Sequence, residues 1–263
     1  MSLGACSVEH GPDSYLTIEQ YMSSTTPTDT DNPAIAARIA SLNGRMSAYE
    51  KKYARVPGSV QLLAVSKTQP FTLIMGAMAC GQINFAENYL QEALEKMDAL
   101  AGHDLIWHFI GPIQSNKTRA LAERFDWIHT LDREKIARRL NEQRPPSMPP
   151  LNILLQVNTS GESSKSGVEP AALSALAACV ASLPRLRLKG LMSIPAPAES
   201  LADQRASFGQ LREARDRLQS EGFSTCTELS MGMSNDFEAA IAEGATMIRI
   251  GTDIFGPRMK HPA

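Results

Sequence analysis

Short apolar runs alternate with amphipathic segments from about residue 33 onward. The apolar runs have the length of strands, and an amphipathic segment precedes each of them or lies between two. We expect eight strands, at Gln61–Ser66, Ile83–Ala86, Leu105–Ile110, Trp127–His129, Leu151–Val157, Leu186–Met192, Cys226–Ser230 and Thr246–Ile250. We expect helices at Ala34–Tyr53, Phe71–Cys80, Tyr89–Leu100, Lys117–Phe125, Glu134–Glu142, Pro170–Ser182, Leu201–Glu221 and Phe237–Glu243.

Eight strands in regular alternation with helices predict an α/β fold, a (β/α)8 TIM-type barrel that forms one domain over residues 33–263. A doubly wound open sheet is the alternative. It loses support because no Gly-x-Gly-x-x-Gly pattern follows the first strand. Residues 1–32 are polar and lack the alternation, and we expect them to form a mobile extension.

Composition narrows the classes of partner. The net charge of −2 argues against a broad nucleic-acid or anionic-membrane surface, and no stretch is long and apolar enough to span a bilayer. No signal-peptide pattern opens the chain, and the four cysteines are scattered, which is typical of a reduced cytoplasmic protein. Four histidines show no metal-ligand spacing, so we assign no metal: His10, His103, His129 and His261.

Lys67 directly follows the first apolar run. A buried ammonium without a partner is unfavourable, and burial lowers the pKa of a lysine so that a neutral amine becomes available for imine formation. The alternative is a lysine at a strand end whose charged group reaches solvent. In a barrel of this type the active site lies at the carboxyl ends of the strands, where Lys67 falls.

The seventh and eighth strands end in segments suited to a phosphate. We expect Ser234 or Asn235 to cap the next helix, with Glu238 completing a capping box, so that free N–H groups face an anion. Gly251 permits close approach of the backbone, and Thr252 adds a hydroxyl and an N–H. The alternative is ordinary capping and a tight turn.

Arg249 lies on the last expected strand. Side chains alternate along a strand, so Arg249 shares the inward face with Met247 and Gly251, while Lys67 shares the inward face of the first strand. The first and last strands of a closed barrel are neighbours, so we expect the two cations to lie close together and the pKa of Lys67 to fall further. The alternative is an arginine paired with Asp253 or Glu228.

Several spaced motifs resemble the pyridoxal phosphate homeostasis proteins, the single-domain relatives of the alanine racemase N-terminal barrel. The resemblance runs from about residue 34 to the C-terminus. It rests on Leu63–Thr68, Phe85–Tyr89, Trp107–Gly111 with Gln114–Lys117, Lys165–Gly167, Gly190–Met192, Leu229–Ser234 and Arg249–Thr252. One departure is Ala86, where the family often has glycine; we expect little effect from one methyl group in a strand.

The resemblance implies a pyridoxal 5′-phosphate (PLP) site in which Lys67 carries the cofactor as an internal aldimine. Arg249 would face the pyridine nitrogen, and Asn88 would lie near the ring. Ser230, Ser234, Gly251 and Thr252 would hold the phosphate, and the backbone of Met231 would contact the cofactor. A guanidinium keeps its proton, so it favours an unprotonated pyridine nitrogen and weakens the ring as an electron sink.

The resemblance also bears on activity. Alanine racemases take a second base, a tyrosine, from an arrangement completed by another domain, whereas only Asp253–Ala263 follow the last expected strand here. We therefore expect a non-enzymatic, cytoplasmic, monomeric PLP carrier that buffers or supplies the cofactor, with transient contacts to PLP-dependent enzymes. The alternatives are a racemase that uses Tyr89 or His108 as second base, and a Schiff-base aldolase acting on a phosphosugar, which leaves Arg249 without a role. We expect His108 itself to be a core or rim residue and Glu87 to make a structural hydrogen bond or ion pair.

Overall fold

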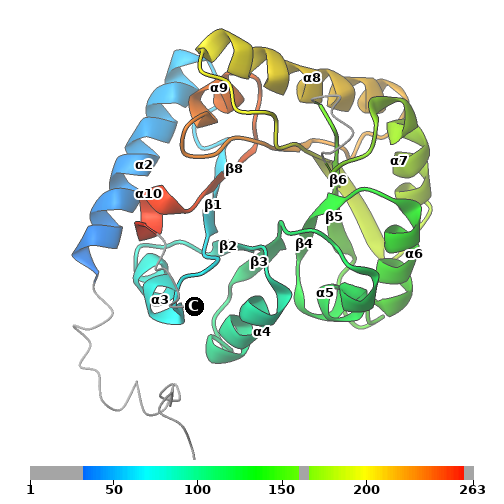
Figure 1. Cartoon of the computed structure of the whole chain (residues 1–263), viewed down its shortest axis with the longest axis horizontal. Coiled ribbons are helices and arrows are strands. Elements are labelled where there is room, and N and C mark those ends of the chain that lie inside the picture. The colour runs from blue at the N-terminus through cyan, green and yellow to red at the C-terminus, as the bar shows by residue number, and fades with distance from the viewer. Residues whose placement is uncertain (1–31, 160–165, 258–263) are drawn as a thin grey trace, which may run out of the picture.

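Eight parallel strands form a closed barrel in the computed structural model, which describes residues 32–159 and 166–257 (Figure 1). Each strand pairs with the next along the chain, and β1 pairs with β8 to close the barrel. The (β/α)8 prediction is thereby confirmed. The strands are β1 (Gln61–Val65), β2 (Asn84–Glu87), β3 (Ile106–Phe109), β4 (Trp127–Leu131), β5 (Leu151–Gln156), β6 (Leu186–Met192), β7 (Glu228–Ser230) and β8 (Met247–Ile250).

Helices surround the barrel as an outer ring (Figure 1). They are α2 (Pro33–Lys52), α3 (Phe71–Ala79), α4 (Leu90–Ala99), α5 (Thr118–Arg124), α6 (Glu134–Gln143), α7 (Leu173–Ala181), α8 (Leu201–Ser220), α9 (Phe237–Ala242) and the short α10 (Thr252–Phe255), which the sequence did not lead us to expect. Two 3-10 turns, η2 (Ser115–Lys117) and η3 (Pro170–Ala172), precede α5 and α7. The expected extension over residues 1–32 lies almost wholly outside the described residues.

The first helix shows how local sequence sets an element. Asn32 precedes α2, and its Oδ1 accepts a hydrogen bond from the Ile35 N–H, while Pro33 occupies the first turn, where its missing N–H is harmless. The buried face of α2 consists of Ile35, Ile39, Leu42 and Met46, at helical spacing. This face packs α2 against the barrel beside α9 and α10.

Alternation along the strands divides the core into two layers. Residues that point outward pack under the helices and include Phe85, Leu229, Ile248 and Ile250. The inward layer is much smaller and consists of Leu63, Val65, Ala86, Leu154, Met192 and Met247. The expected inward direction of the residues before Lys67 is therefore confirmed, and so is the outward direction of the residues that flank Arg249.

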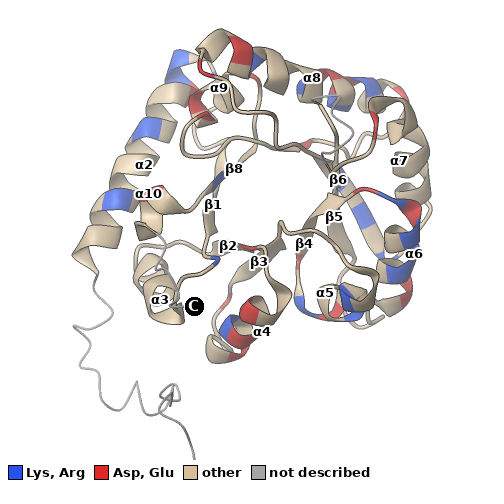
Figure 2. Cartoon of the chain, viewed as in Figure 1, with Lys and Arg blue, Asp and Glu red and all other residues tan. Residues whose placement is uncertain are grey.

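Charged residues of both signs are interspersed on the outer helices α4, α6 and α8 (Figure 2). Within residues 32–159 and 166–257, no helix combines the length and the apolar character needed to cross a membrane. The same part of the chain holds no group of three or more histidine, cysteine, aspartate or glutamate residues placed to bind a metal ion.

Candidate functional site

A cavity of about 480 Å³ opens at the carboxyl ends of the strands. It lies where a barrel of this type places its active site. Six of the eight residues expected from the sequence line it together: Lys67, Asn88, Ser234, Arg249, Gly251 and Thr252. The wall also includes apolar side chains, among them Val65, Ile110 and Ile194. A cavity with a few polar groups on an apolar wall is typical of a site for a small organic molecule.

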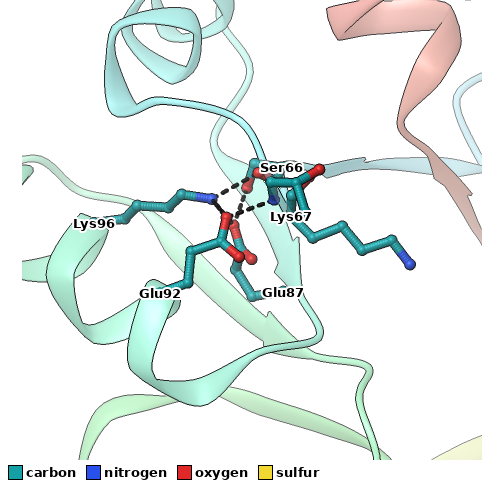
Figure 3. Close-up of polar contacts among 6 residues, drawn as sticks. Ser66, Lys67, Glu87, Glu92 and Lys96 are labelled. Atoms are coloured by element: carbon teal, nitrogen blue, oxygen red, sulfur yellow. Dashed lines mark hydrogen bonds and ion pairs between the residues drawn. The ribbon is translucent and has the colours of Figure 1, made fainter. Parts of the chain in front are cut away.

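Lys67 is half-buried and comes two residues after the end of β1. The next residue, Thr68, has a φ of 60°, which is unusual for a side chain with a branched Cβ. The Thr68 N–H donates to Glu92 Oε1 at 2.5 Å, and this contact holds the unusual turn. In Figure 3 the Lys67 side chain extends away from the carboxylates, and Lys67 lines the cavity.

A buried charge cluster lies behind that turn (Figure 3). Lys96 Nζ donates to the Ser66 carbonyl at 2.6 Å, to Glu87 Oε1 at 2.7 Å and to Glu92 Oε1 at 2.6 Å. Ser66 Oγ donates to the same Glu87 oxygen at 2.6 Å. Burial raises the pKa of the Glu87 carboxyl, and the charge of Lys96 opposes that rise. The cluster therefore fixes the residues on both sides of Lys67, and the structural role expected for Glu87 is confirmed.

Sequence reasoning missed Lys96 and Glu92 as residues that shape the site. Their spacing of four along α4 is readable as an ion pair. The contact of Lys96 with Glu87 depends on how α4 packs over β2, which no local pattern reports.

Arg249 is almost completely buried, with 4% of its surface exposed, and still contributes to the cavity wall. Its Nη1 donates to Ser230 Oγ at 2.8 Å and its Nη2 to the Ser193 carbonyl at 3.0 Å. Burial lowers the pKa of Arg249 to about 10, against the opposing effect of Asp236, so the guanidinium stays charged at neutral pH.

The alternative in which Arg249 pairs with an acid is wrong for both candidates. Asp253 pairs with Arg45, and Glu228 accepts a hydrogen bond from Thr227. Across the described part of the chain, Arg249 forms no ion pair with a carboxylate within 4.0 Å.

The loop after β7 differs from the expectation. Helix α9 begins at Phe237 after Asp236, so neither Ser234 nor Asn235 caps it. The Asp236 Oδ1 instead accepts from the Met233 N–H at 2.6 Å and closes a turn one step before the helix. The capping box is also wrong, because Glu238 accepts from Lys52 Nζ and from the Tyr53 hydroxyl.

That turn nevertheless leaves donors toward the cavity. Among the described residues, the backbone N–H groups of Ser234 and Asn235 have no acceptor, and both residues line the cavity. Thr252 begins α10, whose first N–H groups have no carbonyl in a preceding turn. A Cβ at Gly251 would lie 3.1 Å from the Val65 carbonyl oxygen, so a larger residue would press on the end of β1.

Ser230 and Met231 do not line the cavity, in contrast to the other expected site residues. Ser230 points into the barrel beneath Arg249, where its hydroxyl oxygen is already engaged. Met231 points outward into the core under the helices, and its N–H donates to the Met247 carbonyl. Ser230 is therefore separated from the cavity by Arg249, and Met231 by its outward direction.

Asn88 carries an unsatisfied polar atom at the cavity. Its Oδ1 is buried and has no hydrogen-bond partner among the described residues. A Cβ at Gly111 would lie 2.0 Å from the Asn88 carbonyl oxygen, so only glycine at position 111 allows Asn88 its place. Buried acceptors are almost always paired in folded proteins. A ligand that donates a hydrogen bond would satisfy this atom, so the wall fits a hydrogen-bond donor beside the amine of Lys67.

Neither residue considered as a second base lines the cavity. Tyr89 is 57% exposed on the surface, and His108 is completely buried inside the barrel. Of the described cavity residues, Asp236 is the only carboxylic acid, and burial raises the pKa of its carboxyl.

Comparisons with known proteins place the barrel in a class. The family described as "Alanine racemase, N-terminal domain" matches residues 46–259. Alanine racemase from Corynebacterium glutamicum shares the fold, with a TM-score of 0.65 at 18% identity over 86% of this chain and 61% of that one. The barrel is thus of the alanine racemase N-terminal type.

Closer relatives specify the family within that class. A pyridoxal phosphate homeostasis protein of Pseudomonas aeruginosa is 56% identical over 85% of this chain and 96% of its own length. One from Escherichia coli K12 is 51% identical over 85% of this chain and 97% of its own. The structure of PipY from Synechococcus elongatus with PLP bound has a TM-score of 0.75 at 40% identity, and covers 84% of this chain and 100% of that one. The chain belongs to the pyridoxal phosphate homeostasis protein family.

Proposed function

We propose that this protein binds PLP covalently through Lys67 and holds it as a buffer or supply of the cofactor. The observation that carries the proposal is the meeting of Lys67, Arg249 and the free N–H groups of the β7 and β8 loops on one cavity. Each of these groups suits one part of the cofactor. The amine of Lys67 suits the aldehyde, the guanidinium of Arg249 the pyridine nitrogen, and the N–H donors the phosphate. The family relationship and the PLP-bound relative support the same assignment.

When bound, PLP supplies an aldehyde that condenses with amines and a ring that withdraws electrons from them. The residues of this chain restrain the second property. Arg249 keeps its proton and its charge beside the ring, which favours an unprotonated pyridine nitrogen. Lys67 is then left to bind the aldehyde, with Ser234, Gly251 and Thr252 orienting the phosphate and Asn88 beside the ring.

Retention of the cofactor, and not turnover, is the function that this arrangement supports best. Racemisation needs a base on each face of the ring, and the described cavity wall offers no tyrosine or histidine opposite Lys67. The proposal is of a cytoplasmic monomer that contacts PLP-dependent enzymes transiently. Light scattering of the purified protein with and without PLP tests the monomer directly, and a stable dimer would contradict it.

The test of the function is a visible spectrum of the purified protein with added PLP, followed by borohydride reduction and peptide mass spectrometry. The expected result is an absorbance band that reduction abolishes, with a pyridoxyl adduct on the peptide that contains Lys67. A protein that gains neither band nor adduct would refute the proposal. Rapid racemisation of alanine by the loaded protein would refute the carrier role while leaving the cofactor in place.

A further inference from the structure

A chain of buried polar side chains runs through the interior of the barrel beneath the cavity. It links Arg249 on β8 to Ser230 on β7, His129 on β4, His108 on β3 and Asn84 on β2, and we call these five residues the interior relay. The polar atoms of consecutive members lie 2.8, 2.9, 2.9 and 3.2 Å apart, in that order. The relay thus connects the floor of the cavity to β4, which lies opposite β8 in the closed barrel, and from there to β3 and β2.

Polar residues are unusual at this place. The interior of such a barrel is normally filled by branched apolar side chains. His108, His129 and Ser230 have no exposed surface, and burying polar groups is unfavourable unless every one of them finds a partner. Here each ring nitrogen of both histidines has one. His108 also stacks on Trp127, with ring centroids 5.5 Å apart.

The direction of every hydrogen bond follows from the two ends. Asn84 Oδ1 accepts only, so His108 Nε2 carries a proton, and a neutral His108 then accepts at Nδ1. His129 Nε2 must donate to that atom, which leaves His129 Nδ1 as an acceptor for the Ser230 hydroxyl. The Ser230 oxygen in turn accepts from Arg249, which has donors only. All the protons therefore point from Arg249 towards Asn84.

Both histidines are neutral in this scheme, as their surroundings require. Burial lowers the pKa of His108 to about 3. Burial lowers the pKa of His129 well below its usual range, and the positive charge of Arg249 contributes to that shift. A proton on either ring would leave two donors facing each other or place a second cation near the guanidinium.

We propose that His129, backed by His108, is a positioning residue for Arg249. Through Ser230 it holds the guanidinium at the cavity floor with neutral acceptors only, so the positive charge is left for the ring of the bound cofactor. An aspartate in the same place would hold Arg249 as firmly but would neutralise it. The inference rests on the proposed function, because it assigns the charge of Arg249 to the PLP ring.

The first test needs no cofactor. Nitrogen NMR of the isotope-labelled protein at neutral pH, with signals assigned through His108 and His129 variants, reports which ring nitrogen carries the proton. The expected result is a proton on Nε2 and none on Nδ1 in both histidines. A proton on Nδ1 of either ring, or a doubly protonated ring, would overturn the relay.

The second test is a double-mutant cycle on the rate at which PLP leaves the protein, with His129→Leu and Arg249→Gln made singly and together. His129→Leu should speed release about tenfold in the natural protein and leave it unchanged when Arg249 is already glutamine. The same acceleration in both backgrounds would show that His129 acts on the fold alone and would overturn the proposal.

Two further variants serve the second test, one as a substitute for His129→Leu and one as a control. Ser230→Ala removes a single oxygen from the relay and should reproduce the same coupling to Arg249→Gln if His129→Leu does not fold. Glu50→Gln is the matched control: Glu50 is buried and binds the N–H groups of Gly58 and Val60, before β1, at the opposite end of the barrel. It should lower stability without changing the release rate. A natural protein that forms no adduct at Lys67 would refute the proposed function, whereas an adduct without coupling would refute this inference alone.

Discussion

The two cations of the cavity are held by opposite means. The turn that carries Lys67 is fixed by ions, since Lys96 binds Glu87 and Glu92 just behind it. Arg249 is fixed by neutral acceptors, the Ser230 hydroxyl and the Ser193 carbonyl. The difference matches what each group has to do. Lys67 needs a rigid backbone while its amine reacts, and Arg249 needs to keep its charge available.

The largest expected effect concerns Lys67 itself. Lys67→Ala removes the only described amine on the cavity wall, so the borohydride-trapped pyridoxyl adduct should disappear completely. Lys135→Ala, on the exposed face of α6, should leave the adduct unchanged. Mass spectrometry after reduction measures both. An adduct that persists on another lysine in Lys67→Ala would contradict the role of Lys67 as the amine that binds the cofactor.

Lys96→Met tests the ionic cluster that fixes the turn at Lys67. Without the ammonium, Glu87 is left buried as an uncompensated carboxylate, and the free energy of unfolding should fall by about 3–5 kcal/mol. Urea unfolding measures the loss. Arg119→Met breaks an exposed ion pair at the same spacing in α5 and should cost less than about 1 kcal/mol. Equal losses in the two variants would show that the cluster behind Lys67 contributes no more than a surface pair.

The neutral histidines of the interior relay behind Arg249 predict that stability depends on pH. Both relay histidines have folded pKa values below those of the unfolded chain, so the unfolded state binds more protons and stability falls as the pH drops below about 6.5. Between about pH 6.5 and 5 the two histidines together should remove about 3 kcal/mol. Urea unfolding at several pH values in this range measures how the free energy of unfolding depends on pH. This dependence should be markedly weaker in a variant with His108→Phe and His129→Leu. The same pH dependence of the free energy of unfolding in both proteins would mean that the rings are charged in the folded state.

The smallest expected effect concerns Gly251, whose backbone lies against the end of β1. Gly251→Val adds atoms where even a Cβ would lie 3.1 Å from the Val65 carbonyl oxygen, and it narrows the phosphate loop. We expect PLP affinity to fall about tenfold, a loss of about 1.4 kcal/mol in binding. Gly44→Ala, in the interior of α2 with no atom within 4 Å of its Cβ, should leave affinity unchanged. Unaltered affinity in Gly251→Val would place the phosphate elsewhere.

Sequence patterns predicted the barrel and the place of both cations. The eight apolar runs mark the strands, and the period of two along β1 and β8 turns Lys67 and Arg249 inward. These features depend on neighbours along the chain, so local patterns carry them.

The rest of the site depends on contacts between distant segments. Ser230 meets His129 across the barrel, 101 residues apart in sequence, and only the closed barrel brings them together. The start of α9 at Phe237 was predicted correctly, but its capping residue was not, because Ser234, Asn235 and Asp236 are all good capping residues and the turn at Met233 decided among them. Lys96 was overlooked because an i, i+4 pair on a helix is usually a surface feature.

The central claim is that Arg249, which forms no ion pair among the described residues, presents its positive charge to the ring of PLP anchored at Lys67. The most direct measurement is nitrogen NMR of the protein loaded with PLP labelled at the pyridine nitrogen. The account predicts the chemical shift of an unprotonated ring nitrogen in the natural protein at neutral pH. A protonated ring nitrogen would contradict it, because a cation held beside the ring as described would exclude that proton.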